Sequence, residues 1–137
     1  MKIPSIAVSF AALVMALPVF AATPALPSSG VVSCVGAAVN TRETALGSGI
    51  SAYTQSVVGA YSTRASALQQ AYSSPATVRA GIKAAWAAFN SSIKSASQTW
   101  RTARASAWSQ FRTAVKACKA PATATDSANS SSEASGQ

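Results

Sequence analysis

The apolar residues of the second half of this chain recur every 11 residues, from Arg79 to Cys118. One column of the repeat is aromatic and another is mostly branched aliphatic: Phe89, Trp100 and Phe111 in the first, and Ile82, Ile93, Arg104 and Val115 in the second. Eleven residues make three turns at about 3.67 residues per turn, close to the natural period of an α-helix. The pattern therefore predicts a long, nearly straight helix with one apolar stripe.

The first half carries the same period in a weaker form. Two apolar rows, four residues apart, repeat every 11 residues: Val35, Leu46, Val57 and Leu68, and Val39, Ile50, Tyr61 and Tyr72. These spacings place both rows on one helix face, so a helix is predicted over residues 31–73. Its start fits either a capping box over residues 40–43, which would begin the helix at Thr41, or a position near Val31. Gly47 and Gly49 each weaken the helix by roughly 1 kcal/mol relative to alanine, so a break there, giving three helices, is the alternative.

A turn signal separates the two halves. Residues 72–77 read Tyr-Ser-Ser-Pro-Ala-Thr, in which Ser74 suits a helix N-cap and Pro75 suits the first position of the next helix. The second helix is therefore predicted over residues 75–119. Helix, tight turn and helix make an all-α fold, an antiparallel two-helix hairpin.

The two cysteines support this hairpin. Cys34 and Cys118 lie equally far from a turn centred near residues 75–76, so both reach the open end together. An exported protein meets an oxidising compartment, and the pair predicts one disulfide that closes the rod. The same register predicts further contacts between the helices: Ile93 near Gly59, Trp100 near Ala52 and Tyr53, and Trp86 near Ser66.

The first 21 residues have the parts of a secretory signal peptide. Lys2 supplies the positive charge and residues 3–17 the apolar core. Residues 19–21 (Val-Phe-Ala) supply a cleavage site with small residues at positions −3 and −1. We predict cleavage after Ala21 and a secreted, periplasmic or cell-envelope location, with no transmembrane helix after processing. The alternatives are an uncleaved membrane anchor and lipidation at Cys34, which would leave Cys118 without its partner.

The rest of the chain divides by composition. Residues 22–30 form a Pro/Ser spacer, residues 31–119 the helical hairpin domain, and residues 120–137 a low-complexity tail with no apolar period. Such a sequence cannot bury enough apolar surface to offset its conformational entropy, so the tail is predicted to be disordered.

Charge is distributed unevenly along the chain. The formal net charge is +8, and no Asp or Glu lies between Thr44 and Thr125, where nine Lys and Arg residues occur. A helix face without acids repels itself unless it meets a polyanion or an anionic surface. The residues predicted to form a polyanion-binding face are Arg79, Lys83, Lys94, Arg101, Arg104, Arg112 and Lys116. The predicted partner is an anionic envelope polymer or surface; the alternative is a solvated face that keeps the rod soluble.

Enzyme chemistry has little support. The chain has no His, Glu43 stands alone among the predicted helical residues, and the glycines at 47 and 49 do not make a phosphate loop. We therefore predict a non-enzymatic protein with no catalytic residues, metal site or cofactor. The sequence also has no helix-turn-helix or other nucleic-acid reader motif, although its charge suits nucleic acid.

Trp86 and Trp108 share one column of the repeat. Both are predicted at the edge of the helix–helix interface and partly exposed, where they could stack on a ligand or support self-association of the rod. The rival prediction is a secreted, cationic, membrane-active helical protein, which would need a free apolar face.

The motifs of the domain also carry a resemblance. Cys34 opens the first helix, aromatic blocks read Ala-Ala-Trp-Ala-Ala-Phe at 84–89 and Ala-Trp-Ser-Gln-Phe at 107–111, and the domain closes with Phe-Arg-Thr-Ala-Val-Lys-Ala-Cys at 111–118. Over residues 34–118 the chain resembles a loose group of small, exported, Ala-rich, two-cysteine helical hairpin proteins of uncultured bacteria. The resemblance implies export and a helical hairpin, and no particular function.

Overall fold

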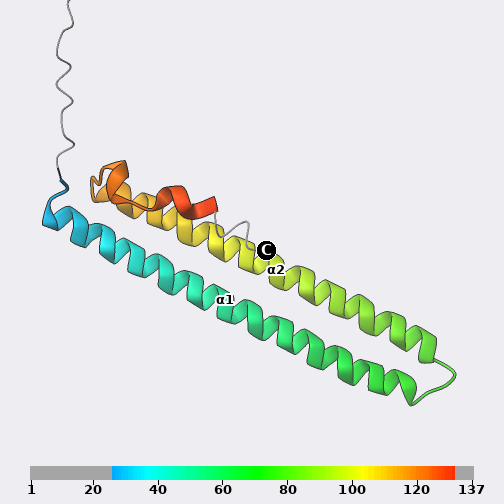
Figure 1. Ribbon diagram of the computed structural model, residues 1–137. Helices are drawn as coiled ribbons and strands as arrows, with labels where there is room; N and C mark the ends of the chain where they lie inside the picture. The colour runs from blue at the N-terminus through cyan, green and yellow to red at the C-terminus, as the bar shows by residue number, and fades with distance from the viewer. Residues whose placement is uncertain (1–25, 132–137) are drawn as a thin grey trace, which may run out of the picture.

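The computed structural model describes residues 26–131, which form an antiparallel hairpin of two long α-helices (Figure 1). Helix α1 spans Ser29–Tyr72 and α2 spans Val78–Ala117; two short 3-10 helices follow, η1 at Ala122–Ala124 and η2 at Ser127–Ser131. The predicted all-α hairpin is confirmed. The predicted signal peptide, residues 1–21, and the first part of the predicted spacer lie outside the described residues.

Helix α1 begins earlier than either predicted start and continues without a break. Ser28 is its N-cap, and the Ser28 side chain accepts a hydrogen bond from the Val31 backbone N–H at 3.4 Å. The predicted alternative of a break at Gly47–Gly49 is wrong. Close packing accounts for the glycine at position 49, because a Cβ atom added there would lie 3.0 Å from the Trp100 side chain. Glycine at this position lets the α2 tryptophan approach the α1 backbone.

Helix α2 begins three residues later than predicted. Ser74 is not its N-cap; residues 75–77 form a turn in which the Thr77 N–H donates to the Ser74 carbonyl oxygen at 3.1 Å. The chain must first cross the roughly 8–10 Å that separates packed helix axes, and this connection uses residues 73–77. The helices are very close at this end, since a Cβ added at Gly81 would lie 2.6 Å from that of Ala71.

The predicted disulfide is present at the open end. Cys34 and Cys118 are bonded, with their Cα atoms 5.8 Å apart. Between the two ends the predicted register also holds, because an added Cβ at Gly49 would lie 3.3 Å from the Cβ of Ala103, its predicted opposite. Trp100 reaches from there onto Gly49, one turn from the predicted Ala52 and Tyr53, and Gly59 lies in one surface hollow with Ser92 of α2, next to the predicted Ile93.

The core is concentrated in the half of the rod nearest the disulfide. Its main buried cluster draws on both helices and includes Val35, Ala38, Leu46, Trp100, Ala107, Trp108, Phe111 and Val115. The other buried hydrophobic residues in the described part of the chain are all alanines: Ala60, Ala71, Ala85 and Ala96. Packing between the helices is therefore much more extensive at the open end than at the turn end.

The start of the predicted disordered tail is folded over residues 120–131. The chain reverses at Lys119, whose φ of 55° is in the left-handed region. The Lys119 and Ala120 N–H groups donate to the carbonyl oxygens of Lys116 and Val115, the two bonds of a Schellman helix end. The segment that follows, residues 120–131, is called the tail segment below; Figure 1 shows it beside the last turns of α2. Residues 132–137 lie outside the described residues.

Candidate functional site

An arginine occupies the packed face of α1 near the open end. Arg42 is only 5 % exposed, the one buried charged residue in the described part of the chain. Its guanidinium carbon lies 4.2 Å from the ring centroid of Trp108 and 4.4 Å from that of Phe111. A cation over an aromatic face is attracted by the ring quadrupole, so these two rings of α2 hold the guanidinium in place.

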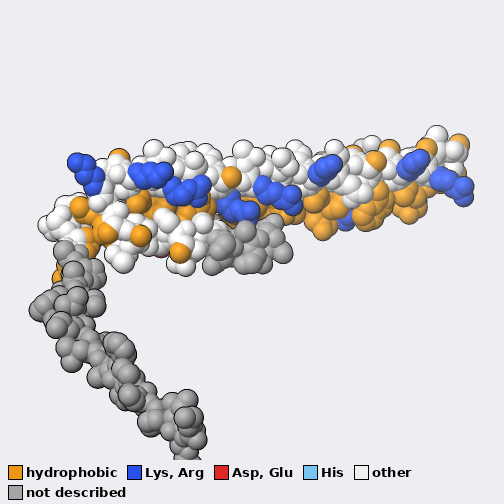
Figure 2. Space-filling model, turned by 90° about the horizontal axis from the view of Figure 1, so that it is seen from above, with side chains coloured by type: hydrophobic (Ala, Val, Ile, Leu, Met, Phe, Trp, Pro, Cys, Tyr) orange, Lys and Arg blue, Asp and Glu red, His pale blue; other side chains and the backbone are white. Residues whose placement is uncertain are grey.

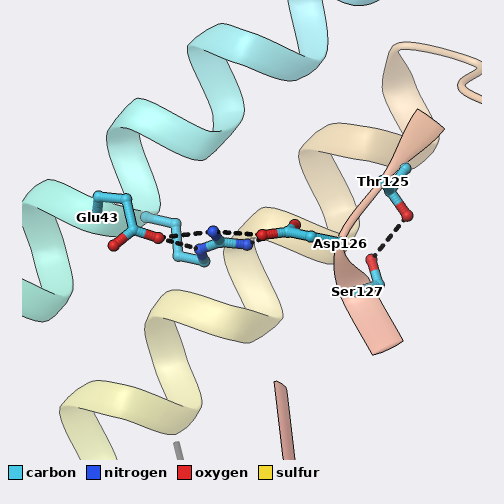
Figure 3. Close-up of polar contacts among 5 residues, drawn as sticks. Glu43, Thr125, Asp126 and Ser127 are labelled. Carbon is cyan, nitrogen blue, oxygen red and sulfur yellow. Dashed lines mark hydrogen bonds and ion pairs between the residues drawn. The ribbon is translucent and has the colours of Figure 1, made fainter. Parts of the chain in front are cut away.

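Two carboxylates neutralise this buried charge. The Arg42 Nη1 and Nη2 atoms donate to the Asp126 Oδ1 and Oδ2 atoms, both at 2.8 Å, and Nε and Nη2 donate to Glu43 Oε1 at 2.9 and 2.6 Å. Figure 3 shows Glu43 on α1 and Asp126 on the tail segment facing each other across the guanidinium. Beside Asp126, the Thr125 hydroxyl donates to the Ser127 hydroxyl at 3.3 Å. A buried charge is costly unless it is paired and hydrogen-bonded, so Arg42 holds the tail segment against the hairpin.

The pKa values of the pair follow from these bonds. The hydrogen bond to Asp126 raises the pKa of Arg42, although its burial opposes this change, and the bond to Glu43 adds to it. The hydrogen bond from Arg42 lowers the pKa of Asp126 below its ordinary value. The charged form of each partner is therefore the stable form at neutral pH.

This pair makes docking of the tail segment dependent on pH. Because the pKa of Asp126 falls on folding, its stabilising contribution is present above the ordinary Asp value of about 4 and is lost as the pH falls through the lower, folded value. The Asp126 side chain is 39 % exposed, so we expect Asp126→Asn to weaken docking of the tail segment by only about 1 kcal/mol. Hydrogen exchange of the backbone amides of residues 120–131 measures this effect. Equal protection in both proteins at neutral pH would contradict it.

A second arginine–aromatic cluster lies 22 residues further along α1. The Arg64 guanidinium carbon is 4.7, 4.4 and 4.2 Å from the ring centroids of Tyr61, Trp86 and Phe89. The two Trp–Phe pairs have nearly the same geometry: the centroids of Trp86 and Phe89 are 5.8 Å apart, those of Trp108 and Phe111 are 5.7 Å apart, and both interplanar angles are 86°. Arg64 thus repeats the arrangement of Arg42 after two 11-residue units, about 33 Å away. We call Arg64, Tyr61, Trp86 and Phe89 the Arg64 cluster.

The two clusters differ in what covers them. Trp108 is 5 % exposed, whereas Trp86 is 45 % exposed and Tyr61 is 52 % exposed. The prediction of a partly exposed Trp108 is therefore wrong, while that for Trp86 agrees with the structure. The reason is tertiary: Trp108 lies against Arg42, which binds Asp126 of the tail segment, whereas Trp86 lies against Arg64. Within residues 26–131, Arg64 has no acidic partner.

Sequence reasoning missed Arg42 and Asp126 as a pair. The sequence pattern assigns Arg42 to a capping box and Asp126 to a disordered tail. One signal was available, because Arg42 and Arg64 have the same 22-residue separation as Trp86 and Trp108. That shared spacing on the two arms indicates a repeated contact between them.

The predicted polyanion-binding residues lie together on one side of α2. At about 100° per residue, all seven fall within an arc of about 120°, which overlaps the packed face where Arg104 shares a repeat column with the buried Val115. Figure 2 shows Lys and Arg side chains in a row along the rod. All are exposed except Arg104, which is half-buried: Arg79, Lys83, Lys94, Arg101, Arg104, Arg112 and Lys116. We call this set the basic face.

Two further properties of residues 26–131 bear on the kind of site present. No group of three or more His, Cys, Asp or Glu residues in that part of the chain could hold a metal ion. No helix there combines the length and hydropathy needed to cross a membrane.

Comparison of the chain with family models, curated proteins and solved structures gives no match. What the structure itself defines is a disulfide-closed helical hairpin with one buried and one exposed arginine–aromatic cluster. The resemblance of residues 34–118 to small exported helical proteins stays a prediction.

Proposed function

We propose that this protein is an exported, non-enzymatic interaction protein of the bacterial cell envelope or exterior whose basic face binds an anionic polymer or surface. The observation that carries the proposal is the absence of acidic residues from the whole sequence of α2. No acid lies between Thr44 and Thr125, and the two nearest, Glu43 and Asp126, both pair with Arg42. The carboxylates closest to the basic face in the sequence are therefore already bound to an arginine of α1.

The spacing of the basic face suits a linear ligand. Arg79, Arg101 and Arg112 share one column of the repeat, so neighbouring rows are about 16 Å apart along the helix. A flexible polyanion can contact several rows at once and release bound counterions, which gives salt-dependent binding with little monomer selectivity. The disulfide is consistent with an oxidising compartment outside the cytoplasm.

We expect the oxidised protein to bind inorganic polyphosphate and polyglutamate at low salt and to release them as salt rises. Changing Arg79, Arg101 and Arg112 together to Gln should reduce the slope of log K against log salt by about two to three, because three fewer charges are neutralised. The matched control changes the same residues to Lys, which keeps the charge and should keep the slope. Fluorescence anisotropy of labelled polymer at several salt concentrations measures the slopes of the Gln and Lys variants.

Two results would contradict the proposal: no binding at low salt, or a Gln variant that binds as tightly as the Lys variant. Either would leave the basic face with the task of keeping the rod in solution. Self-association of the rod, tested by sedimentation, should strengthen when salt or polymer screens this charge.

A secreted, membrane-active protein is the second candidate. It is favoured by exposed apolar residues on α1, among them Ile50, Val58 and Tyr61. Against it, most of the aromatic rings of α2 are packed within the hairpin, and the disulfide keeps the arms together. Dye leakage from anionic vesicles caused by the oxidised protein would support this candidate instead.

A further inference from the structure

The two arginine–aromatic clusters share an equivalent Trp–Phe pair, to which Tyr61 adds a third ring at Arg64, and they differ in what their arginine binds. In the first, Arg42 lies against Trp108 and Phe111 and binds the carboxylate of Asp126 on a peptide segment that lies across the rod. In the second, Arg64 lies against the equivalent rings of Trp86 and Phe89. We propose that the Arg64 cluster binds an acidic side chain of a peptide segment from another protein chain, in the way that Arg42 binds Asp126.

The ring contacts explain why the ligand should be a carboxylate. The guanidinium carbon of Arg64 lies over aromatic rings, and such cation–π contacts leave N–H donors of the guanidinium able to bind an acceptor. Those N–H groups form a fork that matches the two oxygens of a carboxylate, and Arg42 shows this bidentate geometry within the same protein. Arg64 is half-buried between rings, so a carboxylate that reaches it would also be partly shielded from water.

The surroundings of Arg64 explain why the carboxylate should belong to a peptide. Trp86 and Tyr61 are about half exposed beside it, and Val58 and Tyr72 of α1 are exposed on the same half of the rod. Figure 2 shows hydrophobic side chains gathered next to the row of cations over the half of the rod that ends in the turn. A peptide with an acid and small or apolar neighbours can cover both the charge and the rings, as the tail segment does at Arg42. A small anion can neutralise only the charge.

Among residues 26–131, no acidic side chain is left to pair with Arg64. Glu43 and Asp126 are both paired with Arg42. Arg42 and Arg64 are about 33 Å apart along α1. The carboxylate proposed for the Arg64 cluster is therefore that of another chain.

The arginine of this site is not part of the basic face, although Trp86 lies one helical turn from Lys83 of that face. Arg64 belongs to α1 and its rings lie at the junction of the two helices, whereas the basic face belongs to α2 alone. Loss of polyanion binding and loss of peptide binding can therefore be observed independently.

The experiment uses the oxidised full chain and a peptide taken from the segment that occupies the equivalent site. The probe is a peptide of residues 122–130, blocked at both ends, and its matched control carries the Asp126→Asn change. Heteronuclear NMR follows the indole N–H signals of the three tryptophans and the Nε–H signals of the arginines. We expect millimolar probe to shift the Trp86 and Arg64 signals saturably, with the Trp100 and Trp108 signals unchanged. The control peptide should bind at least about fivefold more weakly, which is about 1 kcal/mol at 1.4 kcal/mol per factor of ten.

Protein variants test the same assignment. Arg64→Gln should abolish the shift of the Trp86 signal, and Arg79→Gln, which removes the same charge from the basic face, should leave it intact. Equal binding of probe and control, no shift at all, or a shift that persists in the Arg64→Gln variant would overturn the proposal. An equal shift with free acetate would show a simple anion site and overturn it too. The comparison of probe and control peptide on the unaltered protein decides the question even if the Arg64→Gln variant is poorly folded.

Discussion

Replacing Cys34 and Cys118 with serine is expected to lower the free energy of unfolding by about 4–5 kcal/mol. The bond closes a loop with a sequence separation of 84 residues, so its loss frees a long stretch of the unfolded chain. A two-helix hairpin buries little surface, and this loss approaches the whole stability of many small domains. Urea unfolding followed by far-ultraviolet circular dichroism measures the change.

The reduced wild-type protein is the control, because it also has an open loop but retains both sulfur atoms. It should unfold at nearly the same urea concentration as the serine variant. A loss of less than about 1 kcal/mol in both would mean that interhelical packing, rather than the covalent link, stabilises the rod.

The second large effect is expected for Phe111→Ala, which should cost about 3–5 kcal/mol. Phe111 is 2 % exposed at the centre of the main core cluster. Truncation would leave a cavity and remove one of the two rings that hold the Arg42 guanidinium. The tail segment should also lose protection from hydrogen exchange, since its anchor would be less well positioned.

Phe89 provides a matched control for this variant. It occupies the same column of the repeat 22 residues earlier and packs against Arg64 in the same way, but it is only half-buried. Phe89→Ala should therefore cost clearly less, about 1–2 kcal/mol. Equal losses for the two variants would contradict the conclusion that the core is concentrated near the disulfide.

The uneven core has a consequence for where ligands can act. The half of the rod near the disulfide combines the covalent link, the main core cluster and the docked tail segment. The half near the turn has buried alanines, an exposed Trp86 and an arginine without an acid among the described residues. The half near the disulfide therefore contributes most of the stability, and the half near the turn leaves the surface of Trp86 and Arg64 available for binding.

Much of the fold could be predicted from the sequence because it depends on local and covalent properties. The 11-residue period is a property of consecutive residues, and it predicts long helices with one apolar stripe wherever they pack. The turn at residues 73–77 and the equal distances of Cys34 and Cys118 from it predict the antiparallel pairing and the disulfide, because chain length alone brings the two sulfur atoms together. The basic face could be predicted for the same reason, since helix geometry alone places its residues on one side of α2.

Only the tertiary structure decided the features that depend on how the two helices and the tail segment fit together. The sequence left open whether α1 breaks at Gly47 and Gly49; in the structure it is continuous and Trp100 packs on Gly49, a contact that helix propensities of single residues do not describe. Docking of the tail segment includes one long-range ion pair, between Arg42 and Asp126, whose partners are 84 residues apart. Composition predicts disorder for a polar tail in water, because it does not describe a contact with a buried guanidinium of the other helix.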